Sequence, residues 1–180
     1  MLFVLRDRVG PVAFSRLERD GLIHEVLGGV AVANDVPSTR GLRMHMIAPL
    51  VPSHMWLTGL ATLWLEGAAP PPRVIDVAGP RGAHRTVPSP GSPPLSFHSG
   101  WLGGLPDAAP PRVATVTRAC LDALSHSRAT EALPAVASAV RARATSIAEL
   151  LAAVESIEAH THYRARVESL VGALAALDTA

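Results

Sequence analysis

The sequence predicts an α+β fold, and three features of its 180 residues support this class. Residues 1–40 carry the signals of a helix followed by a β-hairpin. Residues 41–112 hold short strand candidates among most of the 16 prolines, and residues 113–180 show the periodicity of consecutive helices. A chain of this length can bury one sizeable core, or a core with a small appended module. We therefore expect a small segment, 1–40, followed by a larger region, 41–180.

The N-terminal segment has the pattern of a helix that runs into a hairpin. Val12–Arg19 predicts a short helix closed by Asp20-Gly21, and Leu22–Val26 and Val30–Ala33 predict two strands around the Gly28-Gly29 turn. This order is typical of a winged helix-turn-helix, in which the helix is the recognition helix and the hairpin is the wing. Only Leu2–Arg8 precedes Gly10-Pro11. The expectation is therefore a partial winged helix without its first helix, and a coding start upstream of Met1 stays open.

The middle region predicts one helix and a small sheet. Ser53–Leu65 has helical spacing, with Ser53 as its cap and Gly67 and the proline run at 70–72 as its end. Trp56 and Trp64 would lie on one face of this helix, in the core or as a partner surface. Arg73–Ala78 and Leu95–His98 are strand candidates, and the Pro-, Gly- and Ser-rich stretch Arg81–Pro94 between them predicts a loop.

The C-terminal part predicts a small helical bundle. A helix over about Val116–Leu124 is followed by one within Ser127–Arg143, where Pro134 requires either a start near Glu131 or a kink. A third helix carries Ile147, Leu150, Leu151, Val154 and Ile157 on one face, and Ser146 with Glu149 predicts a capping box at its start. The final helix repeats this spacing from Val167 to Leu177.

The basic residues exclude several chemistries. All 16 are arginine, because the sequence contains no lysine, and it contains no glutamine either. Without lysine the chain cannot form a Walker phosphate loop or a protein-kinase ATP site, and it cannot form a Schiff base with pyridoxal phosphate or a carbonyl substrate. The Ala-, Gly-, Pro- and Arg-rich composition indicates a GC-rich bacterial gene.

The remaining motifs favour a protein without catalytic, cofactor or metal sites. His160 and His162 point about 200° apart if their segment is helical, so with Glu158 they predict a solvated turn rather than a metal site. Ser125-His126-Ser127 lacks a G-x-S-x-G elbow, and no G-x-G-x-x-G follows a strand. The Arg118/Asp122 spacing predicts an ion pair on one helical face that contributes modest stability.

Cysteine usage and hydropathy predict a cytoplasmic protein. The lone Cys120 can form no intramolecular disulfide, and its apolar neighbours predict a buried side chain. The apolar run Leu2–Leu5 meets charges too early for a signal peptide, and no apolar stretch approaches the length of a membrane span.

Four stretches resemble the AbiEi-type antitoxins of actinobacterial type IV toxin–antitoxin systems. Ser15–Ile23 with Gly28–Val32 resembles the end of the family's recognition helix and its wing, and Leu57–Gly67 is similar to its "TG-x-[AS]-A-LWL-x-G" helix. Val74–Val77 with Pro80–Arg85 resembles a strand and the loop after it, and Val113–Leu124 is similar to the "V-T-x-x-R-A-x-L-D-x-A" helix.

The resemblance implies a non-enzymatic regulator. The winged helix would bind operator DNA, and the C-terminal region would neutralise a nucleotidyltransferase-like toxin. It suggests a shared role for Asp122, which we interpret as structural. It also implies DNA contacts from the helix and its flanks, at Arg8, Ser15, Arg16, Arg19 and Arg40.

The charge balance favours an alternative. The formal net charge is +1 and residues 1–40 are neutral, whereas duplex DNA is bound mainly through neutralised phosphates. The N-terminal segment could then be a winged-helix remnant packed on the rest. The whole chain would be an interaction or scaffold protein that forms a homodimer and binds no DNA.

Overall fold

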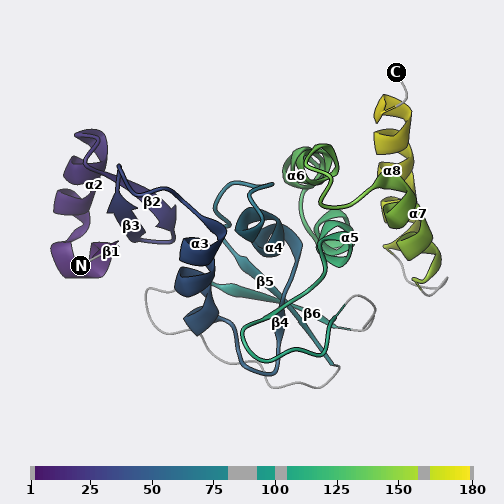
Figure 1. The fold of residues 1–180 in the computed structure, drawn as a ribbon, viewed down its shortest axis with the longest axis horizontal. Helices are drawn as coiled ribbons and strands as arrows, with labels where there is room; N and C mark the ends of the chain where they lie inside the picture. Colours follow the sequence, from purple (N-terminus) through teal and green to yellow (C-terminus); the bar gives the residue numbers. More distant parts are fainter. Residues whose placement is uncertain (1–2, 81–92, 100–104, 158–162, 179–180) are drawn as a thin grey trace.

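The computed structural model describes residues 3–80, 93–99, 105–157 and 163–178. The fold is α+β, as the sequence predicts. Its parts follow one another along the long axis of the molecule. The N-terminal helix and hairpin lie at one end, a second sheet with its covering helices in the middle, and a pair of helices at the other end (Figure 1).

The N-terminal unit consists of β1 (Phe3–Leu5), α1 (Arg6–Val9), α2 (Pro11–Arg19), β2 (Ile23–Leu27) and β3 (Val30–Ala33). The strands form an antiparallel sheet in the order β1-β3-β2, so both helices are inserted between an edge strand and the hairpin. This is the arrangement of a winged helix-turn-helix from its first strand onward. The predicted helix and hairpin are confirmed.

Local sequence explains the bounds of α2. Gly10 (φ 83°) turns the chain out of α1, and Pro11 at the first helical position loses no helical hydrogen bond. Asp20 and Gly21 (φ 69°) end the helix. Strand β1 is not expected from the sequence, because Leu2–Leu5 is a continuous apolar run without alternation.

Helix α3 (Arg40–Ile47) and the short 3-10 helix η1 (Ala48–Leu50) join the N-terminal unit to the centre. The hydroxyl of Thr39 caps α3 by accepting a hydrogen bond from the Leu42 amide at 3.2 Å. Leu42 and Ile47 pack in one core with the hairpin residues Val26, Leu27 and Val32. The hairpin is thus attached to the body by buried apolar side chains.

The central sheet has the order β6-β5-β4-β7, formed by β4 (Trp56–Leu57), β5 (Ile75–Gly79), β6 (Leu95–Ser99) and β7 (Arg112–Val113). β5 and β6 are parallel, β4 is antiparallel to β5, and β7 is parallel to β4. The strand predictions for β5 and β6 are confirmed, whereas β7 is too short to be recognised from the sequence.

The predicted helix Ser53–Leu65 is wrong in its first half. Trp56-Leu57 is strand β4, and the helix α4 spans Gly59–Leu65 with Thr58 as its N-cap. Gly59 has φ 55°, which lies outside the right-handed helical region and separates strand from helix. Pairing with Val77 and Ala78 gives the backbone of β4 its hydrogen bonds in a sheet instead.

Four helices complete the molecule: α5 (Val116–His126), α6 (Ala129–Arg141), α7 (Ile147–Glu155) and α8 (Arg164–Asp178). The predicted capping box of Ser146 and Glu149 is present at the start of α7, and α6 begins at Ala129 with Pro134 inside it. The apolar stripes of these helices form one core with α4 that includes Leu63, Leu124, Leu150 and Val171. Cys120 is buried there as predicted, and burial raises the pKa of its thiol to about 12.

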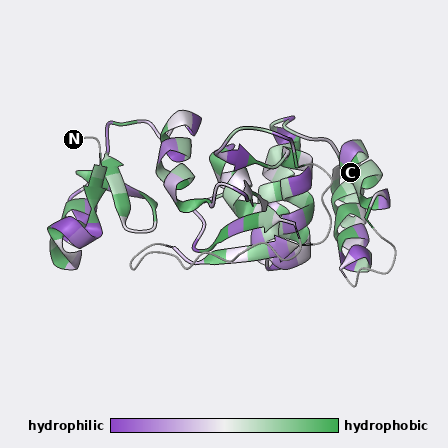
Figure 2. Ribbon diagram, turned by 90° about the horizontal axis from the view of Figure 1, so that it is seen from below, coloured by the Kyte–Doolittle hydropathy of each residue, from purple (hydrophilic) through white to green (hydrophobic). Residues whose placement is uncertain are grey.

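The hydropathy of the N-terminal unit differs between its strands and its longer helix. The hairpin strands are mostly hydrophobic, whereas the helix of residues 11–19 carries both kinds of side chain (Figure 2). Within the described ranges, no helix is both long and apolar enough to cross a membrane.

Candidate functional sites

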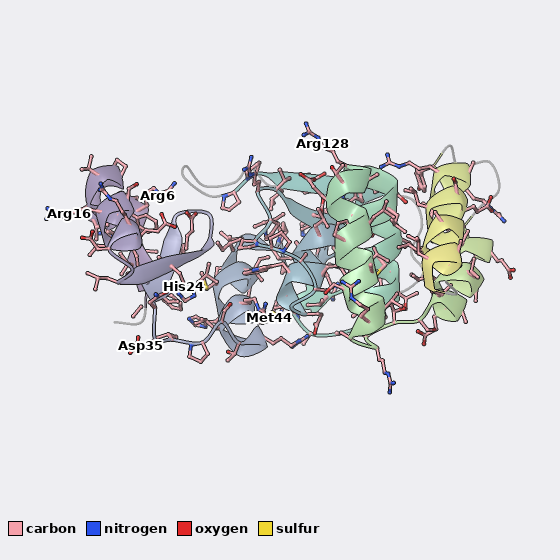
Figure 3. The ribbon with its side chains drawn as sticks, turned by 90° about the horizontal axis from the view of Figure 1, so that it is seen from above. Arg6, Arg16, His24, Asp35, Met44 and Arg128 are labelled. Carbon is pink, nitrogen blue, oxygen red and sulfur yellow. The ribbon has the colours of Figure 1, made fainter. Side chains whose placement is uncertain are left out.

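Helix α2 is exposed over most of its surface. Phe14 is buried and Leu17 half-buried against the hairpin, while every other residue of the helix faces solvent. Val12 exposes 83% of its surface and the Arg16 side chain 76%. Arg16 points away from the body at the end of the molecule (Figure 3). The helix is therefore open to a partner along its outer face.

Four of the five residues predicted to contact DNA lie on α1 and α2. Arg8, Ser15, Arg16 and Arg19 are all exposed. Arg16 forms a long ion pair with Asp20, with 3.8 Å between Nε and Oδ2. Among the residues that the structure describes, neither Arg8 nor Arg19 has an ion-pair partner. Arg8 and Arg19 are thus available to phosphates or base edges, and Arg16 is held only by a long, exposed ion pair.

Arg40, the fifth predicted residue, has a different role. It is the first residue of α3, and its Nε donates to Glu66 Oε1 at 2.8 Å. Glu66 is the C-cap of α4, so this ion pair links two helices of the body. Sequence spacing could not distinguish this arginine from those on α2, because Glu66 lies 26 residues away.

Arg6 is a further cation of the N-terminal unit that sequence reasoning missed. Its guanidinium donates to Glu25 Oε2 at 2.9 Å and lies 4.8 Å from the ring centroid of Phe14. The carboxylate neutralises Arg6 within the protein, and the cation–π contact fixes it over the core of α2. Arg6 therefore braces the unit and adds little free positive charge.

The two tryptophans do not form a common surface. Trp64 exposes only 2% of its surface in the core, and Trp56 lies on β4 rather than on the same helix. The indole of Trp56 donates to the Pro106 carbonyl at 2.7 Å, and Arg112 lies over its ring at 4.8 Å. Trp56 thus holds the segment that leads into β7, and Trp64 offers no area to a partner.

A cluster of polar side chains, all buried except that of the exposed His126, lies between the central sheet and α5. We call Thr58, Asp76, His98, Arg118, Asp122 and His126 the polar cluster. Asp76 Oδ1 is 3.0 Å from His98 Nε2, and Asp76 Oδ2 accepts a hydrogen bond from the Leu60 amide at 3.2 Å. The His98 side chain is only 8% exposed. This carboxylate therefore connects β5 to β6 and to the first turn of α4.

Arg118 and Asp122 form the second half of the polar cluster. Arg118 Nε donates to Asp122 Oδ2 at 2.8 Å, and the Thr58 hydroxyl donates to the same oxygen at 2.5 Å. The two charged side chains are 3% and 6% exposed. The sequence predicts this ion pair from its i, i+4 spacing but assigns it a modest effect, because spacing carries no information about burial.

His126 forms the outer edge of the polar cluster. Its ring stacks on His98 with 4.1 Å between centroids, and Tyr163 meets it edge-on at 5.2 Å. The residue still exposes part of its surface to solvent. Desolvation of the covered ring, together with the charge of His98, lowers the pKa of His126 to about 4, although Asp122 and Asp76 oppose this shift.

This lowered pKa predicts a loss of stability in acid. The unfolded chain titrates His126 near its usual pKa of about 6.5, so between pH 6.5 and 4 it binds a proton that the folded protein does not. The free energy of unfolding should therefore decrease as the pH falls through this window. His126→Asn should flatten this part of the curve when urea unfolding is followed at several pH values. A curve for H126N with the slope of the unmodified protein would contradict the assignment.

Hydrogen bonds within the protein hold both carboxylates of the polar cluster. Asp76 and Asp122 are each held by two hydrogen-bond partners, and the two imidazoles lie too close to admit a group between them. In the described part of the chain, no group of three or more His, Cys, Asp or Glu side chains is arranged to hold a metal ion. The cluster joins sheet to helix through hydrogen bonds where other folds use apolar contacts.

Some of the predicted features lie outside the described residues. These are Glu158, His160 and His162, and most of the Arg81–Pro94 loop.

The class that fold and sites define is an α+β protein with an exposed helix at one end and a largely buried polar cluster between the central sheet and α5. No protein-family model matches the chain, and no curated protein matches it at a significant level.

Proposed function

We propose that this chain is a cytoplasmic, antitoxin-like regulator that binds duplex DNA through α2 and catalyses no reaction. The observation that carries the proposal is the β1-α1-α2-β2-β3 topology, with α2 exposed at the end of the molecule. A recognition helix has to enter the major groove without collision by the rest of the protein. The exposed terminal position of α2 supports this use, while the hairpin of the same unit packs on the body.

Charge limits how the DNA can be held. Arg6 is paired with Glu25, and the other exposed arginines of α1 and α2 are Arg8, Arg16 and Arg19. Residues 1–40 as a whole are neutral. Three phosphate contacts release few counterions, so non-specific attraction should be weak. Base contacts from Ser15 and Arg16 would then supply much of the affinity.

Weak phosphate contact predicts a shallow salt dependence. With about three phosphates neutralised, the logarithm of the binding constant should fall with the logarithm of salt concentration with a slope of about −3. Fluorescence anisotropy with labelled duplex DNA at several salt concentrations measures this slope. A value several times steeper would require cations outside α1 and α2 and would contradict the proposed interface.

The second half of the proposal is the neutralisation of a nucleotidyltransferase-like toxin by the C-terminal region. It rests on the resemblance of Leu57–Gly67 and Val113–Leu124 to antitoxins. These stretches include α4 and α5, which pack on each other at the centre of the molecule.

Two experiments test the proposal. The full chain should retard the DNA upstream of its own coding sequence in a gel, and retard an unrelated duplex of the same length less. When expressed with the product of a neighbouring nucleotidyltransferase-like gene, the chain should co-purify with it and relieve its toxicity. Equal retardation of both duplexes would contradict the regulator, and failure to bind the neighbour's product would contradict the toxin-neutralising role.

A further inference from the structure

The turn that joins β2 to β3 faces the body of the protein. A Cβ placed on Gly28 would lie 2.5 Å from Cγ of Pro93, the residue that leads toward β6. Gly28, Gly29 and Pro93 also line a cleft of about 910 Å³, together with Leu5 of the N-terminal unit and Pro72 of the central region. The turn therefore lies against central residues and does not project from the molecule.

Hydrogen bonds fix the turn from the inside. The Gly29 amide donates to Glu25 Oε1 at 2.7 Å, and the Gly29 carbonyl accepts from the Arg6 amide at 2.8 Å. Glu25 Oε2 in turn accepts from the Arg6 guanidinium. Both backbone polar groups of Gly29 are thus used within the protein and are not available to a phosphate.

Burial anchors the strands on either side of the turn. Val26, Leu27 and Val32 are at most 2% exposed, and they share a core with Leu42 and Ile47 of α3. Swinging the hairpin outward would expose these apolar side chains to water, which is unfavourable. Figure 1 places β2 and β3 between α2 and α3, so the hairpin lies inward of α2.

On the basis of the proposed function, we propose that this protein contacts the bases of duplex DNA in the major groove alone, through α2. The hairpin turn does not contact DNA; it packs against the body and sets the orientation of α2. An α-helix fits the major groove, whereas the minor groove is narrower and is entered by arms or extended turns. A turn held by Glu25, Arg6 and Pro93 cannot act as such an extension.

Methylation interference tests this proposal with the unmodified full chain. Dimethyl sulfate methylates guanine N7 in the major groove and adenine N3 in the minor groove, so one reagent probes both grooves. In the DNA upstream of the gene, methylation of guanine N7 within the site should reduce the bound fraction by about tenfold. Methylation of adenine N3 should leave it unchanged, and interference at adenine N3 beside the site would overturn the proposal.

A double-mutant cycle tests the contact between turn and body. Gly28→Ala should lower the urea midpoint strongly in the unmodified chain and less in the P93A background, because removal of the proline ring makes room for the new Cβ. The backbone strain at φ 34° is the same in both backgrounds and cancels. Additive effects would overturn the contact.

The two tests separate the proposal from the function on which it rests. Binding with adenine N3 interference overturns the major-groove proposal and leaves the DNA-binding function standing. Absence of any preferential DNA binding overturns both, while the cycle still reports whether the turn is held by the body.

Discussion

Asp122→Ala should destabilise the protein by about 3–5 kcal/mol, the largest effect that we expect from a single substitution. Asp122 accepts hydrogen bonds from Arg118 and Thr58, and both charged side chains of the pair are almost completely buried. Removal of the carboxylate takes this counter-charge away from the buried Arg118 guanidinium. Chemical unfolding measured by circular dichroism would show the loss directly.

The chain supplies a matched control for this substitution. Arg164 and Glu168 have the same i, i+4 spacing and a distance of 2.7 Å, but the glutamate side chain is 48% exposed. Glu168→Ala should therefore cost at most about 1 kcal/mol. A double R118L/D122A variant should recover part of the loss, because an apolar pair needs no charge compensation. Equal costs for D122A and E168A would refute the importance of burial.

Gly59→Ala should produce the second large loss of stability. Gly59 has φ 55°, and an added Cβ would lie 2.7 Å from Asp76 Oδ2 and 2.9 Å from its Cβ and Cγ. Asp76 cannot move aside freely, because its carboxylate is bonded to His98 and to the Leu60 amide. The substitution therefore combines backbone strain with overpacking of a buried carboxylate.

Gly21 separates these two contributions. It has φ 69°, and nothing lies within 4 Å of the Cβ that an alanine would add. Gly21→Ala should thus show the strain alone, about 1–2 kcal/mol. Gly59→Ala should exceed it by about 1–3 kcal/mol in the same unfolding assay. Similar losses for the two variants would mean that Asp76 yields and that the polar cluster is loosely packed.

Local patterns predicted the elements that are stabilised locally. The capping box of Ser146 and Glu149, the Gly28-Gly29 hairpin and the helical stripes of the C-terminal part all appear as expected. The helix prediction for 53–58 is wrong because the segment has helical spacing but satisfies its backbone by pairing with β5. Such pairing depends on residues about 20 positions away, and the periodicity of a local segment carries no information about them.

The candidate sites show the same difference between features that local sequence determines and features that tertiary contacts determine. The exposed arginines of α2 follow from a local helix-and-hairpin pattern, so the sequence could name them. The polar cluster joins residues from Thr58 to His126, and only the spacing of Arg118 and Asp122 and the aspartate within an apolar strand hinted at it. The partner of Arg40 could not be predicted either, because Glu66 is distant from it in the sequence. Tertiary contacts decide whether a charge is free for a ligand or already neutralised.

DNA binding by paired arginine variants tests the central claim most directly. Arg16→Ala/Arg19→Ala removes two exposed charges from α2. Arg128→Ala/Arg141→Ala removes two exposed charges from the N-cap and the last residue of α6, so the net charge changes equally. Arg16 and Arg128 lie in different parts of the molecule (Figure 3). Anisotropy titration with the DNA upstream of the gene should show a loss of about tenfold or more for R16A/R19A and no change for R128A/R141A. Equal losses for the two variants, or no preference of the unmodified chain for this DNA, would contradict the account.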